Sequence, residues 1–241
     1  MDLSGYLLEP LREDGEFVLY RARAKHLELP SVLLLSPVSN RPSVETLKKI
    51  DHEYSLKDEL DATWAVRPLA ISVCDDKKVL VLEDLGGEPL GQLIRGPMEI
   101  KPFLRLAIVL ADAIGQLHKR DLIHKDVKLS NILVSSDRDR VWLTGFGLAS
   151  RLTRERQPLE APEFIAGTLA YMAPEQTGRM NRSIDSRSDL YALGVTLYEL
   201  LTGSLPFTAS DPMEWCIAIS QDNRYRRTSA SRPCLSPFLR S

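Results

Sequence analysis

Short apolar runs separated by turn residues fill the first third of the chain. The runs "EFVLYRARA" (16–24) and "SVLLLSPV" (31–38) have the length and the β-branched or leucine-rich composition of strands. A third run, "KKVLVLEDLGG" (77–87), ends in a Gly-Gly break and is typical of a central strand. The pattern therefore predicts a small sheet.

One helix interrupts these strands. In "VETLKKIDHEYSLKDELDATW" (44–64), apolar residues recur at positions 47, 50, 54, 56 and 60, which approximates helical spacing. We expect residues 1–85 to form one unit made of a sheet and a helix.

The pattern changes to helical after residue 85. The segment "IKPFLRLAIVLADAIGQLHKR" (100–120) gives the strongest helix prediction in the chain, and "SDLYALGVTLYELLTG" (188–203) gives a second. Asp189 or Ser188 is expected to cap the second helix, and Gly203 to end it. Two short runs between them, "NILV" and "VWL", have strand length. The apolar stripe of the first helix is Phe103, Leu106, Ala107, Leu110, Ile114 and Leu117.

A strand-rich half followed by a helix-rich half indicates an α+β fold with two lobes. We place the second lobe at residues 86–215. In residues 216–241 the apolar residues are sparse and lose any period, while five arginines face one acidic residue, Asp222. This composition predicts an irregular tail.

Composition and charge exclude some functions. The chain has 241 residues, 44% hydrophobic and 27% charged, with a net charge of -2, so no basic excess indicates a nucleic-acid partner. Cys74, Cys216 and Cys234 form no metal-type or disulfide-type pattern. No signal peptide and no apolar run of the ~18 residues that span a membrane is present, so we expect a cytoplasmic chain.

The stretch "IHKDVKLSNILV" carries the candidate chemistry. Asp126, Lys128 and Asn131 follow one another at relative positions 0, +2 and +5 in a loop between two apolar runs. Phosphoryl transfer to a hydroxyl needs a carboxylate that accepts the proton, a cation near the phosphate and an oxygen ligand for the metal. The spacing supplies these three groups, although a polar turn can also contain the same residues.

Further motifs resemble those of Ser/Thr protein kinases. His124-Lys125-Asp126 resembles the family's catalytic loop, and Ala173-Pro174-Glu175 resembles the end of its activation segment. Thr168 resembles the threonine that helps to seat the substrate hydroxyl, and Asp189 the buried aspartate that anchors the catalytic loop.

The resemblance implies a two-lobed kinase fold, with ATP and Mg²⁺ as cofactors. Asp126, Lys128, Asn131 and Thr168 would be the catalytic residues, and Asn131 would also be a metal ligand. Leu82, Glu83, Leu85 and Leu133 would hold the nucleotide, with Glu83 to Leu85 as the hinge.

More narrowly, residues 167–207 are similar to the N-terminal kinase-like domain of bacterial proteins that continue into ATPase, GAF and histidine kinase modules. Protein partners or such downstream modules are expected. The helical lobe would lack its last helices, and one hypothesis for the irregular tail is a shifted reading frame after Trp215. Glu175 would then lack its arginine partner.

The nucleotide site departs from the family pattern in three places. Arg12, Asp14 and Phe17 stand where the glycine-rich loop has glycines, and the acidic residues there would repel phosphate. The strand lysine maps to Leu35, give or take one residue. The helix carboxylate matches Glu53, which without that lysine is expected to turn toward solvent.

The third departure is in "VWLTGFGLAS" (141–150), where Gly145 replaces the aspartate that ligates Mg²⁺. Nucleotide binding is expected to be weak or absent. The sequence therefore predicts a pseudokinase or a very weak kinase that acts as a regulatory module. The alternatives are an active ATP-dependent kinase with Asp126 as base, and a small-molecule kinase, which "GTLAYMAPE" disfavours.

Overall fold

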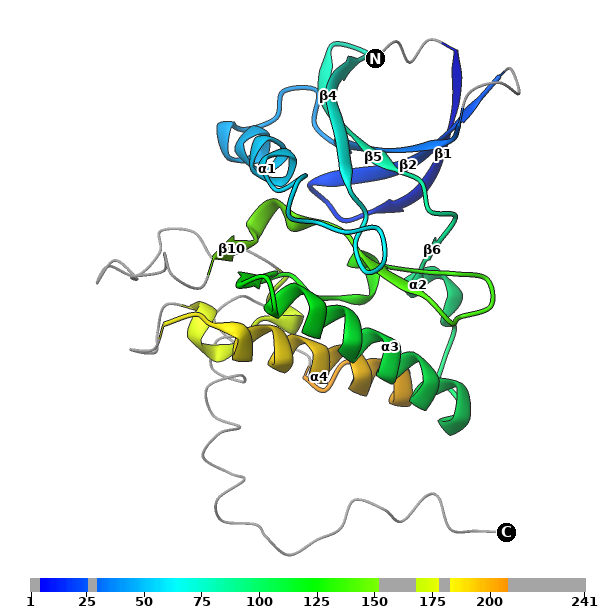
Figure 1. Cartoon of the computed structure of the whole chain (residues 1–241), viewed down its shortest axis with the longest axis vertical. Coiled ribbons are helices and arrows are strands. Elements are labelled where there is room, and N and C mark those ends of the chain that lie inside the picture. The colour runs from blue at the N-terminus through cyan, green and yellow to red at the C-terminus, as the bar shows by residue number, and fades with distance from the viewer. Residues whose placement is uncertain (1–4, 26–29, 152–167, 178–182, 208–241) are drawn as a thin grey trace, which may run out of the picture.

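The computed structural model describes residues 5–25, 30–151, 168–177 and 183–207, and within them it shows two lobes (Figure 1). The predicted α+β architecture is confirmed. The predicted tail, residues 216–241, lies outside the described residues.

The first lobe is built on a five-stranded antiparallel sheet. The strand order is β1-β2-β3-β5-β4. The three predicted strand runs are confirmed as β2, β3 and β5, whereas β1 and β4 were not predicted. The strands are β1 (Tyr6–Glu13), β2 (Phe17–Ala24), β3 (Val32–Pro37), β4 (Pro68–Cys74) and β5 (Lys77–Glu83).

Helix α1 (Val44–Ser55) packs beside this sheet and is shorter than predicted. The Ser43 side chain caps its start by accepting the Thr46 N–H. The chain leaves the helix at Leu56, and residues 56–64 form turns. Leu56 and Leu60, part of the predicted helical stripe, are instead buried in the core of the second lobe.

The second lobe contains two long helices that lie side by side (Figure 1). Its helices are α2 (Leu90–Leu93), α3 (Ile100–His118) and α4 (Ser186–Thr202). Its short strands are β6 (Glu88–Pro89), β7 (Leu122–Ile123), β8 (Ile132–Val134), β9 (Val141–Leu143) and β10 (Ser150–Arg151), which form the sheets β6-β8-β9 and β10-β7. Four 3₁₀ turns span Leu129–Asn131, Phe146–Leu148, Leu169–Tyr171 and Pro174–Thr177.

Both predicted long helices are present, but the start of α4 differs from the prediction. Asp185 caps it, because the Asp185 side chain accepts the Arg187 N–H. Asp189 and Ser188 lie inside the first turn. Gly203 ends the helix as predicted, in a left-handed conformation with φ 73°.

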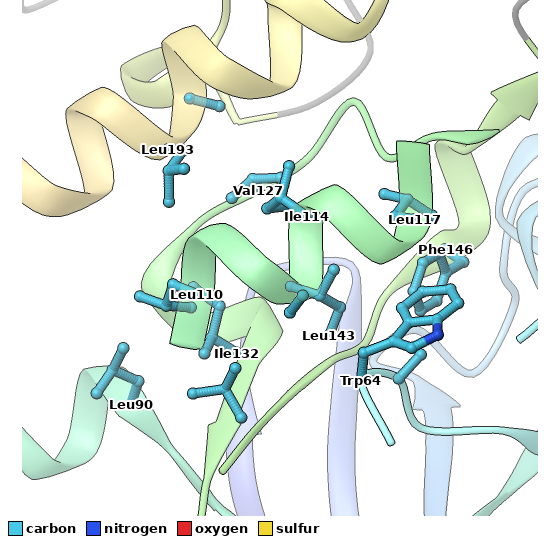
Figure 2. Packing of buried hydrophobic residues seen from close by; sticks show 14 of the residues in the cluster. Trp64, Leu90, Leu110, Ile114, Leu117, Val127, Ile132, Leu143, Phe146 and Leu193 are labelled. Atoms are coloured by element: carbon cyan, nitrogen blue, oxygen red, sulfur yellow. The ribbon is translucent and has the colours of Figure 1, made fainter. Parts of the chain in front are cut away.

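The core of the second lobe encloses Phe146, the residue that follows Gly145. Figure 2 shows Ile114 and Leu117 of α3 among buried side chains from several elements. Phe146 is fully buried there and meets the Trp64 ring edge-on, with 6.3 Å between ring centroids. The phenylalanine that follows Gly145 therefore contributes to the packing of the core.

A buried arginine of the sheet holds the connection between the lobes. The Arg21 side chain, on β2, donates to Asp84 Oδ2 at 3.0 Å and to the Gly87 carbonyl at 2.6 Å, and it also pairs with Glu88. The side chains of Arg21 and Asp84 are only 5% and 3% exposed. This guanidinium thus binds three points of the segment that joins β5 to β6.

Candidate active site

Helix α4 fixes the loop that carries Asp126. The fully buried Asp189 carboxylate accepts the backbone N–H groups of His124 and Lys125, both at 2.8 Å, and lies 2.9 Å from His118 Nε2. These contacts agree with the anchoring role that the sequence predicted. Lys125 adopts φ 68°, a conformation that costs energy for a residue with a side chain. The anchor therefore holds the loop in a strained shape.

His124 connects this loop to the segment that contains Gly145. It is fully buried, its Nε2 lies 3.1 Å from the Thr144 carbonyl, and its ring lies 4.7 Å from the Phe146 ring. Burial lowers the pKa of His124, which favours the neutral ring. Its Nδ1 accepts the Asp126 N–H at 3.2 Å.

The four residues predicted to be catalytic lie together. Asp126 Oδ2 is 2.9 Å from both Lys128 Nζ and Asn131 Nδ2, and Asp126 Oδ1 accepts the Thr168 N–H at 3.1 Å. Lys128 Nζ donates to Thr168 Oγ1 at 2.7 Å. The structure thus brings these side chains into one network, while their catalytic roles remain predictions.

A cavity of about 220 Å³ opens beside this network. Its walls combine the catalytic loop, Gly145 and the β1–β2 hairpin. Leu35 lines it, so the position of the missing strand lysine is Leu35, whereas Leu34 belongs to the apolar cluster on the other face of the sheet. Two of the three acidic hairpin residues, Asp14 and Glu16, line it as well, and the third, Glu13, is exposed.

Glu53 contradicts the expectation that it turns toward solvent. It is 1% exposed on α1, its Oε1 is buried without a hydrogen-bond partner, and the backbone N–H groups of residues 145–147 face the carboxylate. Burial raises the pKa of Glu53 to about 7, against the opposing effects of these N–H groups and of Arg12. The prediction failed because it assumed an ionised carboxylate, whereas burial favours the neutral, protonated form of Glu53, which can stay in the core without a lysine partner.

Two side chains of the cavity had no predicted role. Arg12 and Lys49 both line it, and Lys49 Nζ pairs with Glu16 Oε2 at 2.5 Å. Arg12 was placed at a glycine position of the family's loop, but the direction of its side chain could not be predicted, because neither β1 nor its irregular pairing with β2 was expected. A helical projection of α1 places Lys49 four residues before Glu53, on the same face, and could have found it.

A family model described as "Protein kinase domain" matches residues 34–235, more than half of the chain. The chain belongs to the protein kinase family. Its similar relatives are kinases of the Ser/Thr type. Serine/threonine-protein kinase PknL of Mycobacterium tuberculosis is 41% identical over 224 residues, which cover 87% of this chain and 52% of PknL.

Two other relatives give the same picture. A probable serine/threonine-protein kinase of Clostridium perfringens is 29% identical over 86% of this chain and 30% of its own length. Serine/threonine-protein kinase PknB of M. tuberculosis is 34% identical over 56% of this chain and 21% of its own length. The chain thus spans between a fifth and about half of the length of these kinases.

A kinase of this family generally uses ATP and Mg²⁺, but the described residues do not fit the metal. A β-carbon on Gly145, which has φ 82°, would lie 2.8 Å from Asn131 Oδ1. That amide oxygen is buried without a hydrogen-bond partner. It is a neutral ligand, whereas Mg²⁺ in such sites relies on carboxylates and substrate phosphates. No group of three or more acidic, histidine or cysteine side chains that could hold a metal occurs in the described part of the chain.

The residues predicted to hold the adenine lie apart from the cavity lining. Leu82 and Leu133 are 0% exposed and belong to one apolar cluster with Leu11, and Leu85 packs against it. Glu83 pairs with Arg67 at 2.8 Å. These side chains are close to the connection between the lobes, as a hinge requires, but Leu82 and Leu133 offer no accessible surface to a ligand.

Glu175 has a partner, contrary to the expectation of an unpaired acid. The Ser188 hydroxyl donates to Glu175 Oε1 at 2.6 Å. Ser188, which was expected as a possible cap of the helix, is thus the partner of Glu175 within the described residues. Among the helices of the described residues, none is long and apolar enough to cross a membrane.

Proposed function

We propose that this kinase domain is a pseudokinase, or a very weak kinase, that regulates a bacterial signalling protein by binding rather than by phosphorylation. Gly145 carries the proposal, because a hydrogen stands where the metal-binding carboxylate of the family would stand. Electrostatic stabilisation by the metal is a dominant part of phosphoryl transfer, so its loss lowers the rate by orders of magnitude.

The residues at the positions where the family binds the nucleotide support the same proposal. Leu35 cannot pair with phosphate, and the Asp14 and Glu16 carboxylates face the cavity. Leu82 and Leu133, which were predicted to hold the nucleotide, are enclosed in apolar packing. ATP binding by this domain is therefore proposed to be weak or absent.

The contacts of Asp126 suggest a structural role for the loop motif that resembles the catalytic loop of the family. Asp126 accepts contacts from Lys128, Asn131 and the Thr168 backbone, so it ties the loop to the segment before Tyr171. Such a network contributes to stability without any chemistry.

The second candidate function is an active ATP-dependent Ser/Thr kinase with Asp126 as the catalytic base. The observation in its favour is that Asp126, Lys128 and Thr168 lie within hydrogen-bond distance of one another. A substrate hydroxyl placed beside Asp126 could transfer its proton there.

A phosphotransfer assay separates the two functions. The wild-type chain and Asp126→Asn are incubated with labelled ATP, Mg²⁺ and a general protein substrate. The pseudokinase proposal expects equal, background-level incorporation. Incorporation by the wild type that exceeds Asp126→Asn at least tenfold would establish the active kinase instead.

The proposal also includes the proteins or modules on which the domain acts. The relatives extend well beyond the matched region, since the match covers 30% of the C. perfringens kinase and 52% of PknL. We therefore propose that the domain transmits its state to protein partners or to signalling modules such as ATPase, GAF and histidine kinase domains. Co-purification of the chain with such modules tests this, and no retention under low salt would argue against it.

A further inference from the structure

Arg12 enters the cavity because the edge strand is irregular. In the pairing of β1 with β2, Pro10 faces Tyr20 and Arg12 faces Leu19, so Leu11 is an extra residue. A bulge of this kind redirects the side chains that follow it. Leu11 packs into the apolar core, and the Arg12 side chain, 5% exposed, lines the cavity.

Arg12 still has binding capacity there. Its Nη1 donates to Asp14 Oδ2 at 2.5 Å, but its Nε is buried without a partner. A buried guanidinium with an unused donor costs free energy, and an additional acceptor in the cavity would offset that cost. The unpartnered Nε therefore points to a ligand with several acceptor oxygens.

Asp14 stands between two cations. Its Oδ2 lies 3.7 Å from Lys128 Nζ as well as beside Arg12, and its Oδ1 accepts the Phe17 N–H at 3.0 Å. Burial opposes its ionisation, yet Arg12 and Lys128 hold the pKa of Asp14 below its usual value. An ionised carboxylate thus occupies the space between Arg12 and Lys128.

We propose that Arg12 and Lys128 form a metal-independent site for a diphosphate group, and that Asp14 fills this site until the ligand displaces it. The chemistry matches because both cations pair well with phosphate oxygens, and arginine does so with two parallel donors. The cavity of about 220 Å³ is smaller than the roughly 300–1,000 Å³ of pockets for drug-sized ligands, which favours a small anion.

The geometry allows the exchange. Asp14 lies at the exposed tip of the hairpin, beside Gly15, whereas Arg12 is held by the strand. The carboxylate can leave without disturbing the core, and the two cations stay. The inference goes beyond the proposed function, since it requires neither Mg²⁺ nor phosphotransfer.

Calorimetric titration of the whole chain with inorganic pyrophosphate, in EDTA, tests the proposal. Asp14→Asn removes the internal anion with little change of shape, so its affinity for pyrophosphate should exceed that of the wild type at least tenfold. Glu13→Gln is the matched control, because it removes the same charge from an exposed neighbour. Its affinity should equal that of the wild type.

A second pair of variants tests the cations. Asp14→Asn combined with Arg12→Met should lose the gained affinity, and so should Asp14→Asn combined with Lys128→Met. The thermal unfolding of each double variant shows whether it folds. If the Arg12→Met double variant does not fold, the affinity of the Lys128→Met double variant tests the proposal. Equal affinities of Asp14→Asn and Glu13→Gln, or tight binding that survives in both double variants, would overturn the proposal.

ADP in the same buffer identifies the source of the diphosphate. Pyrophosphate bound more tightly than ADP identifies a free anion, and ADP bound at least as tightly identifies a nucleotide. Because the assay contains no metal and no substrate, a negative result leaves the pseudokinase proposal standing. Conversely, detection of phosphotransfer would not by itself exclude the anion site.

Discussion

At the scale of single residues, Glu53 gives the domain an unusual dependence on pH. Its pKa is about 7 in the folded chain, against an ordinary value of 4.5. Between these two values the unfolded chain has lost the proton and the folded chain has kept it. Stability therefore falls as pH rises from about 4.5 to 7 and then stays constant, with a total loss of about 3 kcal/mol.

Glu53→Gln should remove this dependence. The glutamine carries no charge at any pH, so the difference in unfolding free energy between variant and wild type should shift by about 2–3 kcal/mol in favour of the variant from pH 5 to pH 8. Urea unfolding at both values measures it. The control is Glu45→Gln, an exposed position in the first turn of the same helix, which should show no such shift.

Gly145→Asp should not restore a kinase. Its backbone is in the left-handed region, and a β-carbon would lie 2.8 Å from Asn131 Oδ1, so we expect a loss of about 1–3 kcal/mol in unfolding free energy and no phosphotransfer. Gly15→Asp is a matched control with φ 80° and open space around its β-carbon. Robust phosphotransfer by Gly145→Asp would show that Leu35 and the hairpin are not limiting.

At the scale of elements, α4 is the support of the catalytic loop. Asp189→Asn keeps the size of the side chain but replaces one of its two acceptor oxygens by an NH2 group, so one buried backbone N–H of the loop faces a donor, which should cost about 3 kcal/mol. Asp185→Asn makes the same change at the cap of the same helix, where asparagine and aspartate are nearly equivalent. Thermal unfolding of both variants checks this, and equal transition temperatures would contradict it.

The elements also show how far sequence reasoning reaches. Helices α3 and α4 and strands β2, β3 and β5 were predictable, because apolar spacing or composition marks them. Strand β1 was not, since it carries Pro10 and an extra residue, and its bulge then decides that Arg12 enters the cavity. The end of α1 was misplaced because Leu56 and Leu60 are apolar at helical spacing but are buried from turns.

In the candidate site, the spacing of Asp126, Lys128 and Asn131 predicted which residues would meet. The burial of the Glu53 side chain could not be predicted in the same way. It depends on how closely α1 packs against the backbone of residues 145–147, which no side-chain pattern reveals.

At the scale of the whole molecule, ligand binding should stabilise the fold without help from Mg²⁺. Because a ligand stabilises in proportion to the logarithm of its concentration over Kd, a metal that adds no contacts adds no stability. The transition temperature with ADP should therefore be the same in Mg²⁺ and in EDTA. An additional rise of several degrees in Mg²⁺ would mean that Asn131 and the nucleotide hold the metal after all.

The Arg21 contacts with Asp84, Gly87 and Glu88 bear on the movement of the two lobes. Opening the cleft by rotation about this connection would have to break charge-assisted hydrogen bonds of a guanidinium that water barely reaches. Because these hydrogen bonds must break first, we expect the two lobes to move as one rigid body on the nanosecond scale. The lobes should separate only in the infrequent openings that break the Arg21 contacts. Entry of a ligand would then be set by the frequency of those events rather than by diffusion.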